Sequence, residues 1–195
     1  MTTLPLEVRN RLDIWYLVIK EAYEYMLSED YFWRLLLENK DKISNYSQEY
    51  FIGNNKKHTN VLISAIFGLQ IAAVVLFWHI FDKTAQGGNM ISSNTNKFLD
   101  ELRKDIKDYV IKKLDWTSNK YDDFIRRIGK IRHKYAAHYD GRYAEIERIA
   151  IDQGFVEKIK LPGVNFNREE SKEFILLLET VYEFIEQRMK EFNDK

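Results

Sequence analysis

The sequence predicts an all-α protein, a helical bundle of five or six helices in one domain that spans residues 1–195. Apolar residues recur at helical spacing along most of the chain. The two prolines, Pro5 and Pro162, lie near the two ends, so long helices are permitted almost throughout. With 45% apolar and 31% charged residues, a chain of this length can bury a sizeable core.

Three helices are expected in the first half of the chain. Residues 7–28 and 30–50 each carry apolar side chains at mostly helical spacing. The next residues, 53–60 (GNNKKHTN), are expected to form a polar connector. The third helix covers residues 61–81 (VLISAIFGLQIAAVVLFWHIF), and the loop DKTAQGGNMISSN follows it.

Helical spacing resumes over residues 98–114, and the segment WTSNKYDD then breaks it. Ser118 or Asn119 is a candidate N-cap for the next helix, which begins near Tyr121. That helix runs into the motif segment described below.

The chain near residues 150–166 is expected to be irregular or to form a short hairpin that turns at Pro162-Gly163. A last helix begins near Asn167, because Glu170 stands three residues later as a capping-box partner. An apolar stripe along that helix predicts that it packs on the bundle.

The apolar third helix is long enough to raise the possibility of a membrane span. Gln70 and His79 lie within it, and polar groups are costly in a bilayer without internal partners. The amphipathic helices also need an apolar element to pack around, so a buried central helix is preferred. Ser64, Gly68 and Ala72 are spaced four apart, which lets another helix approach closely in either setting.

Composition excludes several kinds of site. The absence of cysteine rules out disulfides, zinc–thiolate sites, iron–sulfur clusters and cysteine nucleophiles. Neither HExxH nor a glutamate three residues before a histidine occurs, so no metal and no cofactor are expected. His79 and Asp82 are interpreted as a polar pair at a helix end, with a ligand or catalytic role as the alternative. The first residues, MTTLPLEVRNRLDIW, lack the features of a secretion signal, so a cytoplasmic protein is expected.

The segment IRHKYAAHYDGR, residues 131–142, carries the most chemistry. Arg132, Tyr135 and His138 follow one another at intervals of one helical turn. Between residues 126 and 142, six basic side chains oppose one acid in a protein whose net charge is zero. The excess indicates a local anion site, although a solvated helix face is the structural alternative.

The string RHKYAAH fits the pattern Arg-x(4–6)-His and resembles the signature of the HEPN superfamily (higher-eukaryote and prokaryote nucleotide-binding domains). The wider string IRHKYAAHYD and the helix ending FWHIFD are similar to the abortive-infection U-type branch. The resemblance covers roughly residues 60–142. It implies a single HEPN-like helical domain, and a metal-independent endoribonuclease of a toxin–antitoxin or phage-defence system.

The resemblance also implies roles for individual residues. His138 is the expected acid–base group, because a histidine exchanges protons near neutral pH, and Arg132 is expected to grip the scissile phosphate. Tyr139 directly follows His138, whereas a related branch has His-x-Tyr, so Tyr139 cannot take that tyrosine's role. Asp140 could orient His138 or cap the helix end. The further candidates for contacting RNA are His133, Lys134, Tyr135, Tyr139, Asp140 and Arg142.

The implied partners are RNA, a second copy of the chain in a homodimer whose cleft lies between protomers, and an antitoxin of the nucleotidyltransferase type. Two alternatives stay open. One is a non-catalytic HEPN module that binds nucleotides, RNA or a protein partner. The other is a membrane-anchored regulator that uses residues 61–81. Residues 144–166 contain no recognisable catalytic or binding motif, and the hypothesis for them is a substrate-specific or partner-binding role.

Overall fold

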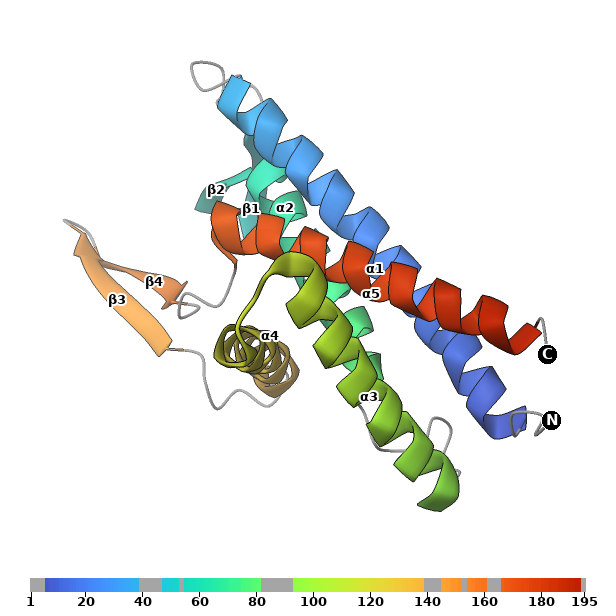
Figure 1. Cartoon of the computed structure of the whole chain (residues 1–195). Coiled ribbons are helices and arrows are strands. Elements are labelled where there is room, and N and C mark those ends of the chain that lie inside the picture. The colour runs from blue at the N-terminus through green and yellow to red at the C-terminus, as the bar shows by residue number, and fades with distance from the viewer. Residues whose placement is uncertain are drawn as a thin grey trace.

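The computed structural model describes residues 6–38, 47–52, 55–81, 93–138, 145–151, 154–160 and 166–193. Within them the predicted helical bundle is confirmed, with two β-hairpins added (Figure 1). The elements in order are α1 (Leu6–Glu38), β1 (Ser47–Ile52), β2 (Asn55–Asn60), α2 (Val61–Phe77), the 3₁₀ turn η2 (Trp78–Ile80), α3 (Ser93–Leu114), α4 (Ser118–His138), β3 (Glu145–Ile151), β4 (Gly154–Lys160) and α5 (Arg168–Asn193).

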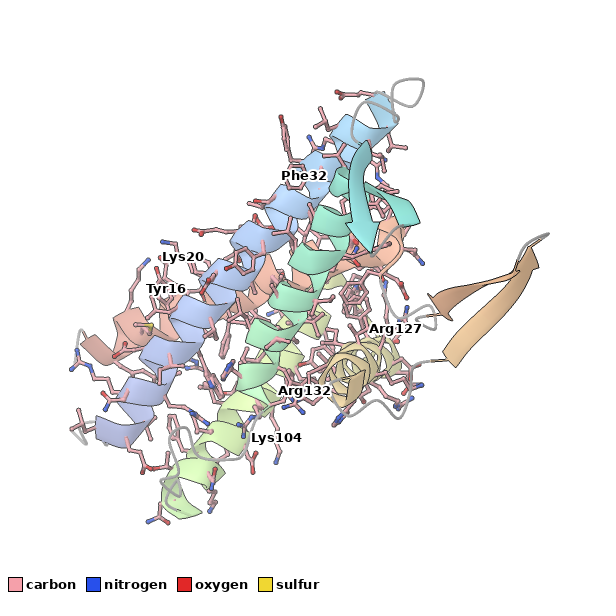
Figure 2. The ribbon with its side chains drawn as sticks, turned by 180° about the vertical axis from the view of Figure 1, so that it is seen from behind. Tyr16, Lys20, Phe32, Lys104, Arg127 and Arg132 are labelled. Atoms are coloured by element: carbon pink, nitrogen blue, oxygen red, sulfur yellow. The ribbon has the colours of Figure 1, made fainter. Side chains whose placement is uncertain are left out.

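The long helix α1 forms one wall of the bundle. It packs along α2 and α5, α3 packs on α5, and α4 packs on α2 (Figure 1, and from behind Figure 2). The buried apolar residues of α1 in the main core repeat at intervals of three and four, which is the spacing of one helix face. They are Val8, Leu12, Trp15, Ile19, Ala22 and Met26, and none is more than 2% exposed. The other helices contribute to the same core, among others through Phe77, Ile106, Ile128, Phe174 and Leu177.

The predicted division of the first segment into helices 7–28 and 30–50 is wrong, since α1 is continuous to Glu38. Pairs spaced four residues apart begin at the predicted break and continue the helix beyond it: Trp33 donates a hydrogen bond to Glu29, and Arg34 forms an ion pair with Asp30. Such pairs support a helix because side chains four apart lie on the same face.

The polar connector predicted at residues 53–60 is also wrong. β2 occupies most of it and pairs antiparallel with β1, in a register that places Ile52 opposite Asn55. Gly53 and Asn54 stand between the two strands, and Gly-Asn is a typical two-residue hairpin connection. The sequence signal was therefore present, and the polar character of NKKHTN masked it.

The hairpin predicted near residues 150–166 is present, but it lies closer to the N-terminus than expected. β3 and β4 pair antiparallel from Glu145↔Lys160 to Ile151↔Gly154, so the turn falls between Ile151 and Gly154 and not at Pro162-Gly163. The register makes backbone partners of residues of opposite charge, as in Glu145↔Lys160. Figure 1 shows the hairpin standing to one side of the helices, beyond α4.

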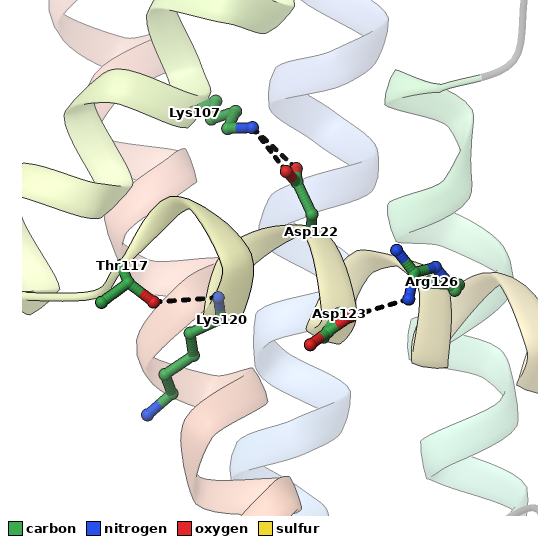
Figure 3. Close-up of polar contacts among 6 residues, drawn as sticks. All are labelled: Lys107, Thr117, Lys120, Asp122, Asp123 and Arg126. Carbon is green, nitrogen blue, oxygen red and sulfur yellow. Dashed lines mark hydrogen bonds and ion pairs between the residues drawn. The ribbon is translucent and has the colours of Figure 1, made fainter.

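The turn between α3 and α4 is fixed by local hydrogen bonds. Asp115 adopts a left-handed conformation (φ 52°), and the N–H of Trp116 bonds the carbonyl of Ile111 at 3.0 Å, which closes the end of α3. The N-cap of α4 is Thr117, whose Oγ1 accepts the N–H of Lys120 at 3.1 Å (Figure 3). The predicted caps Ser118 and Asn119 are therefore one and two residues too late.

The start of the last helix is as predicted. The N–H of Glu170 donates to Oδ1 of Asn167 at 2.9 Å, and the N–H of Asn167 donates to Oε2 of Glu170 at 2.9 Å. This reciprocal pair is a capping box, which satisfies two backbone donors that the first turn of a helix would leave free.

The apolar helix α2 is only 17 residues long, and no helix in the described part of the chain is long and apolar enough to cross a membrane. Its expected place in the core is confirmed, with Ile66, Ala73 and Phe77 buried. The expected close approach of another helix at Gly68 is wrong, since a Cβ built there meets nothing within 4 Å.

Candidate active site

A single helix carries both residues of the Arg-x(4–6)-His pattern, because α4 runs from Ser118 to His138 without a break. The buried stripe of α4 consists of Tyr121, Phe124, Ile128 and Ile131, again at intervals of three and four. His133 is exposed, and Arg132 is partly exposed, so both lie off that stripe. Packing of the apolar face therefore determines on which side of α4 Arg132 and His133 lie.

His138 stands six positions after Arg132 in α4, and this spacing has a geometric consequence. In an α-helix it corresponds to about 9 Å along the axis and about 120° around it. Arg132 and His138 of one chain thus lie on different faces of α4, and His138 is its last residue.

Some of the other candidate residues lie in α4, and the rest lie outside the described part of the chain. Lys134 and Tyr135 belong to α4, but their side chains, like that of His138, are outside what the structure describes. Tyr139, Asp140 and Arg142 lie outside the described residues altogether, so their expected roles stay predictions.

The basic excess of residues 126–142 is smaller in the structure than in the sequence. Arg126 pairs with Asp123 at 2.7 Å (Figure 3), and Arg127 pairs with Glu170 of α5 at 3.2 Å. Both acids lie outside the segment over which the charges were counted. Two of the six positive charges are therefore largely compensated.

Two basic residues of α4 differ from these. Lys130 and Arg132 make no hydrogen bond or ion pair with any residue that the structure describes. Figure 2 shows Arg132 and Arg127 on different sides of α4, as five helical positions require. The guanidinium of Arg132 is thus available for an anion from outside the described part of the chain.

The segment next to Arg132 is held by η2. The rings of His133 and Trp78 meet edge to face, with their centroids 6.4 Å apart. Trp78 also lies against Gly129, one turn earlier on α4. Sequence reasoning missed Trp78 as part of this site, since 54 residues separate it from Arg132 and only the fold brings them together.

A second polar cluster lies inside the bundle, where α1, α2 and α5 meet. Glu29 is fully buried, and its Oε1 accepts hydrogen bonds from Nε1 of Trp33 (2.8 Å), Nε2 of Gln70 (2.6 Å) and Oγ of Ser171 (3.0 Å). Burial raises the pKa of Glu29 above its usual value, and these three hydrogen bonds partly oppose that rise.

The sequence held a signal for this cluster. Glu29 follows Met26 by three residues and so continues the buried stripe of α1, and Gln70 interrupts the apolar run of α2. The internal partner that a buried Gln70 requires is Glu29.

No group of metal-ligating side chains occurs among the described residues. His79, at the end of the apolar segment, is half-buried, and Asp82 lies outside the described residues, so their expected pairing stays a prediction. No protein-family model, curated protein or solved structure matches this chain. The HEPN resemblance therefore rests on the motif and its helical setting.

Proposed function

We propose that this protein is a metal-independent endoribonuclease of the HEPN type, acting in a toxin–antitoxin or phage-defence system. The observation that carries the proposal is the state of Arg132. Its neighbours Arg126 and Arg127 are each engaged by a carboxylate, whereas Arg132 has no partner in the described chain and shares α4 with His138. An arginine without a carboxylate partner is suited to bind a phosphate through two parallel hydrogen bonds.

The proposed reaction uses the RNA's own 2′-OH, which DNA lacks. The 2′-oxygen attacks the adjacent phosphorus while the bond from phosphorus to the 5′-oxygen breaks. His138 accepts the proton of the 2′-OH, and an imidazolium returns a proton to the departing 5′-oxygen. Arg132 stabilises the charge that develops on the phosphoryl oxygens. The products are a 2′,3′-cyclic phosphate and a 5′-OH.

The helix geometry supports a site shared between two chains. Arg132 and His138 of one chain lie on faces of α4 about 120° apart, which makes it difficult for both to engage the same phosphate. Two copies of α4 related by a two-fold axis could instead supply Arg132 from one protomer and His138 from the other. The homodimer and a nucleotidyltransferase-type antitoxin are part of the proposal.

The test is RNA cleavage in EDTA by the wild type, Arg132→Ala and His138→Ala. Both variants should lose cleavage. Arg126→Ala is the matched control, because it removes an arginine of α4 that is already paired with Asp123 and should cleave normally. Activity in either motif variant, with contaminating nuclease excluded, contradicts the site. Salt-dependent RNA binding without any product indicates the non-catalytic module instead.

Mixing the two inactive variants tests the shared site. If Arg132 and His138 act across the dimer, re-associated heterodimers contain one intact site each, and about one quarter of wild-type activity returns. If both residues act within one chain, every site carries a substitution and no activity returns.

A further inference from the structure

The turn η2 packs unusually closely on α4. A Cβ built on Gly129 would lie 2.7 Å from Cη2 of Trp78, which is closer than two carbon atoms can approach without one of them moving, and 3.0 Å from Cζ3. Gly129 is buried, so the indole lies directly against the backbone of α4. Any larger residue at position 129 must displace Trp78.

Trp78 contacts α4 at a second point. His133 stands four residues after Gly129, on the same side of the helix, and its ring meets the indole edge to face at an interplanar angle of 63°. These two contacts, one turn apart, place the indole along the Gly129–His133 side of α4. Arg132 directly precedes His133 on the same helix, so a displacement of α4 at this contact also displaces Arg132.

The turn η2 is itself tied to the core. The carbonyl of Ile80 accepts a hydrogen bond from Nε of Arg103 at 2.5 Å, and Arg103 also bonds Asp100 of α3 at 2.7 Å. The guanidinium of Arg103 lies over the ring of the buried Trp15 of α1, 5.3 Å from its centroid. The contacts of Arg103 therefore connect the turn that carries Trp78 to α1 and α3.

We propose that Trp78 is a positioning residue for RNA cleavage, which places the Arg132–His133 segment of α4 through its contacts with Gly129 and His133. This role rests on the proposed ribonuclease function. Trp78 acts through the position of α4 and need not touch RNA itself. A rotation of α4 by a fraction of a turn would move the guanidinium of Arg132 away from the phosphate. Misplacement of about 1 Å can cost about 100-fold in rate.

The experiment replaces Gly129 by alanine. Gly129→Ala favours the helix and adds one methyl group, so any loss of activity comes from the displaced indole. Gly68→Ala is the matched control, since Gly68 is also helical and its new methyl group meets nothing within 4 Å. The rescue variant is Gly129→Ala with Trp78→Phe, because phenylalanine keeps an aromatic ring but lacks Cη2 and Cζ3.

Two measurements are made on the full chain of each variant. The first is the NMR signal of the His133 imidazole, assigned by its loss in His133→Ala, because the neighbouring indole ring shifts that signal. The second is kcat and KM for RNA cleavage. Gly129→Ala should move the His133 signal and lower kcat about 10- to 100-fold with a smaller change in KM. Gly68→Ala should do neither, and the rescue variant should regain most of kcat.

The outcomes separate this role from the proposed function. An unmoved His133 signal in Gly129→Ala overturns the contact, and a moved signal with unchanged kcat overturns the positioning role, while the ribonuclease assignment stands in both cases. A wild type that does not cleave RNA refutes the proposed function and the positioning role with it. If Gly129→Ala does not fold, Trp78→Leu removes the indole without overlap and must lower kcat, or the role is refuted.

Discussion

Substitution of Glu29 tests the hydrogen-bonded polar cluster inside the bundle. Glu29→Ala removes the one carboxyl oxygen that accepts hydrogen bonds from α1, α2 and α5 together. In this variant Nε2 of Gln70 keeps its hydrogen bonds to Oγ of Ser171 (3.0 Å) and to the carbonyl of Phe166 (3.3 Å). The hydroxyl of the buried Ser171 and the indole N–H of the half-buried Trp33 both lose their acceptor.

The expected loss of stability follows from these contacts. An orphaned buried donor costs about 1–3 kcal/mol, and the cavity left by a large buried side chain adds about 2 kcal/mol. Glu29→Ala should therefore destabilise the protein by about 3–5 kcal/mol. Glu29→Gln keeps an acceptor oxygen and adds a donor to a cluster in which Oε1 of Gln70 has no partner among the described residues. Its cost should stay within about 1 kcal/mol at low pH.

The two variants also differ in their dependence on pH. Because burial raises the pKa of Glu29, the folded protein retains this proton at pH values where the unfolded chain has lost it. The contribution of Glu29 to stability is therefore greatest below the usual glutamate pKa, and it is lost as pH rises from there through the raised pKa. The glutamine of Glu29→Gln does not titrate. The stability of this variant relative to the wild type should therefore increase as pH rises from the usual to the raised pKa, by about 1.4 kcal/mol for each unit of pKa increase.

Urea unfolding of both variants between acid and neutral pH measures these differences. Glu24→Gln is the matched control, since Glu24 is an exposed glutamate of the same helix and should show no comparable gain with pH. A free-energy difference between Glu29→Gln and the wild type that does not change with pH would refute the raised pKa. A Glu29→Gln variant as unstable as Glu29→Ala would show that the cluster requires a carboxylate.

Three further predictions concern helix caps and the motif arginine. Thr117→Ala should cost about 1 kcal/mol of unfolding free energy, while Ser118→Ala, one residue beyond the cap, should cost much less in the same denaturation experiment. Asn167→Ala breaks the capping box of α5 and should cost a similar amount by the same assay. Arg132→Lys keeps the charge but loses the two-pronged grip, so kcat for RNA cleavage should fall while the salt dependence of RNA binding stays the same.

Much of the fold could be predicted because it depends on local pattern. The buried stripe of α1 and the capping box of α5 are set by residues three or four apart, and both are readable in the sequence. The cap of α4 was misplaced because Thr117, Ser118 and Asn119 are all good caps and stand side by side. The strand β2 was missed because its polar residues resemble a loop.

The candidate site could be predicted only in part, because its environment comes from distant segments. The charge of Arg127 is balanced by Glu170, 43 residues away, so a local count overstated the basic excess. Trp78 meets Gly129 and His133 only through the packing of η2 on α4. The helix that carries Arg132 and His138 was correctly expected, since its apolar stripe is strictly periodic.

Cleavage of a short RNA that the wild type cuts at one position, in EDTA, tests the central claim most directly. The same RNA is prepared with a single 2′-deoxy nucleotide on the 5′ side of that position. Cleavage of the all-ribose strand to a 2′,3′-cyclic phosphate, and none of the deoxy-substituted strand at that position, is the predicted result. Equal cleavage of both strands, or cleavage that stops when EDTA is added, would contradict a metal-independent attack by the 2′-OH.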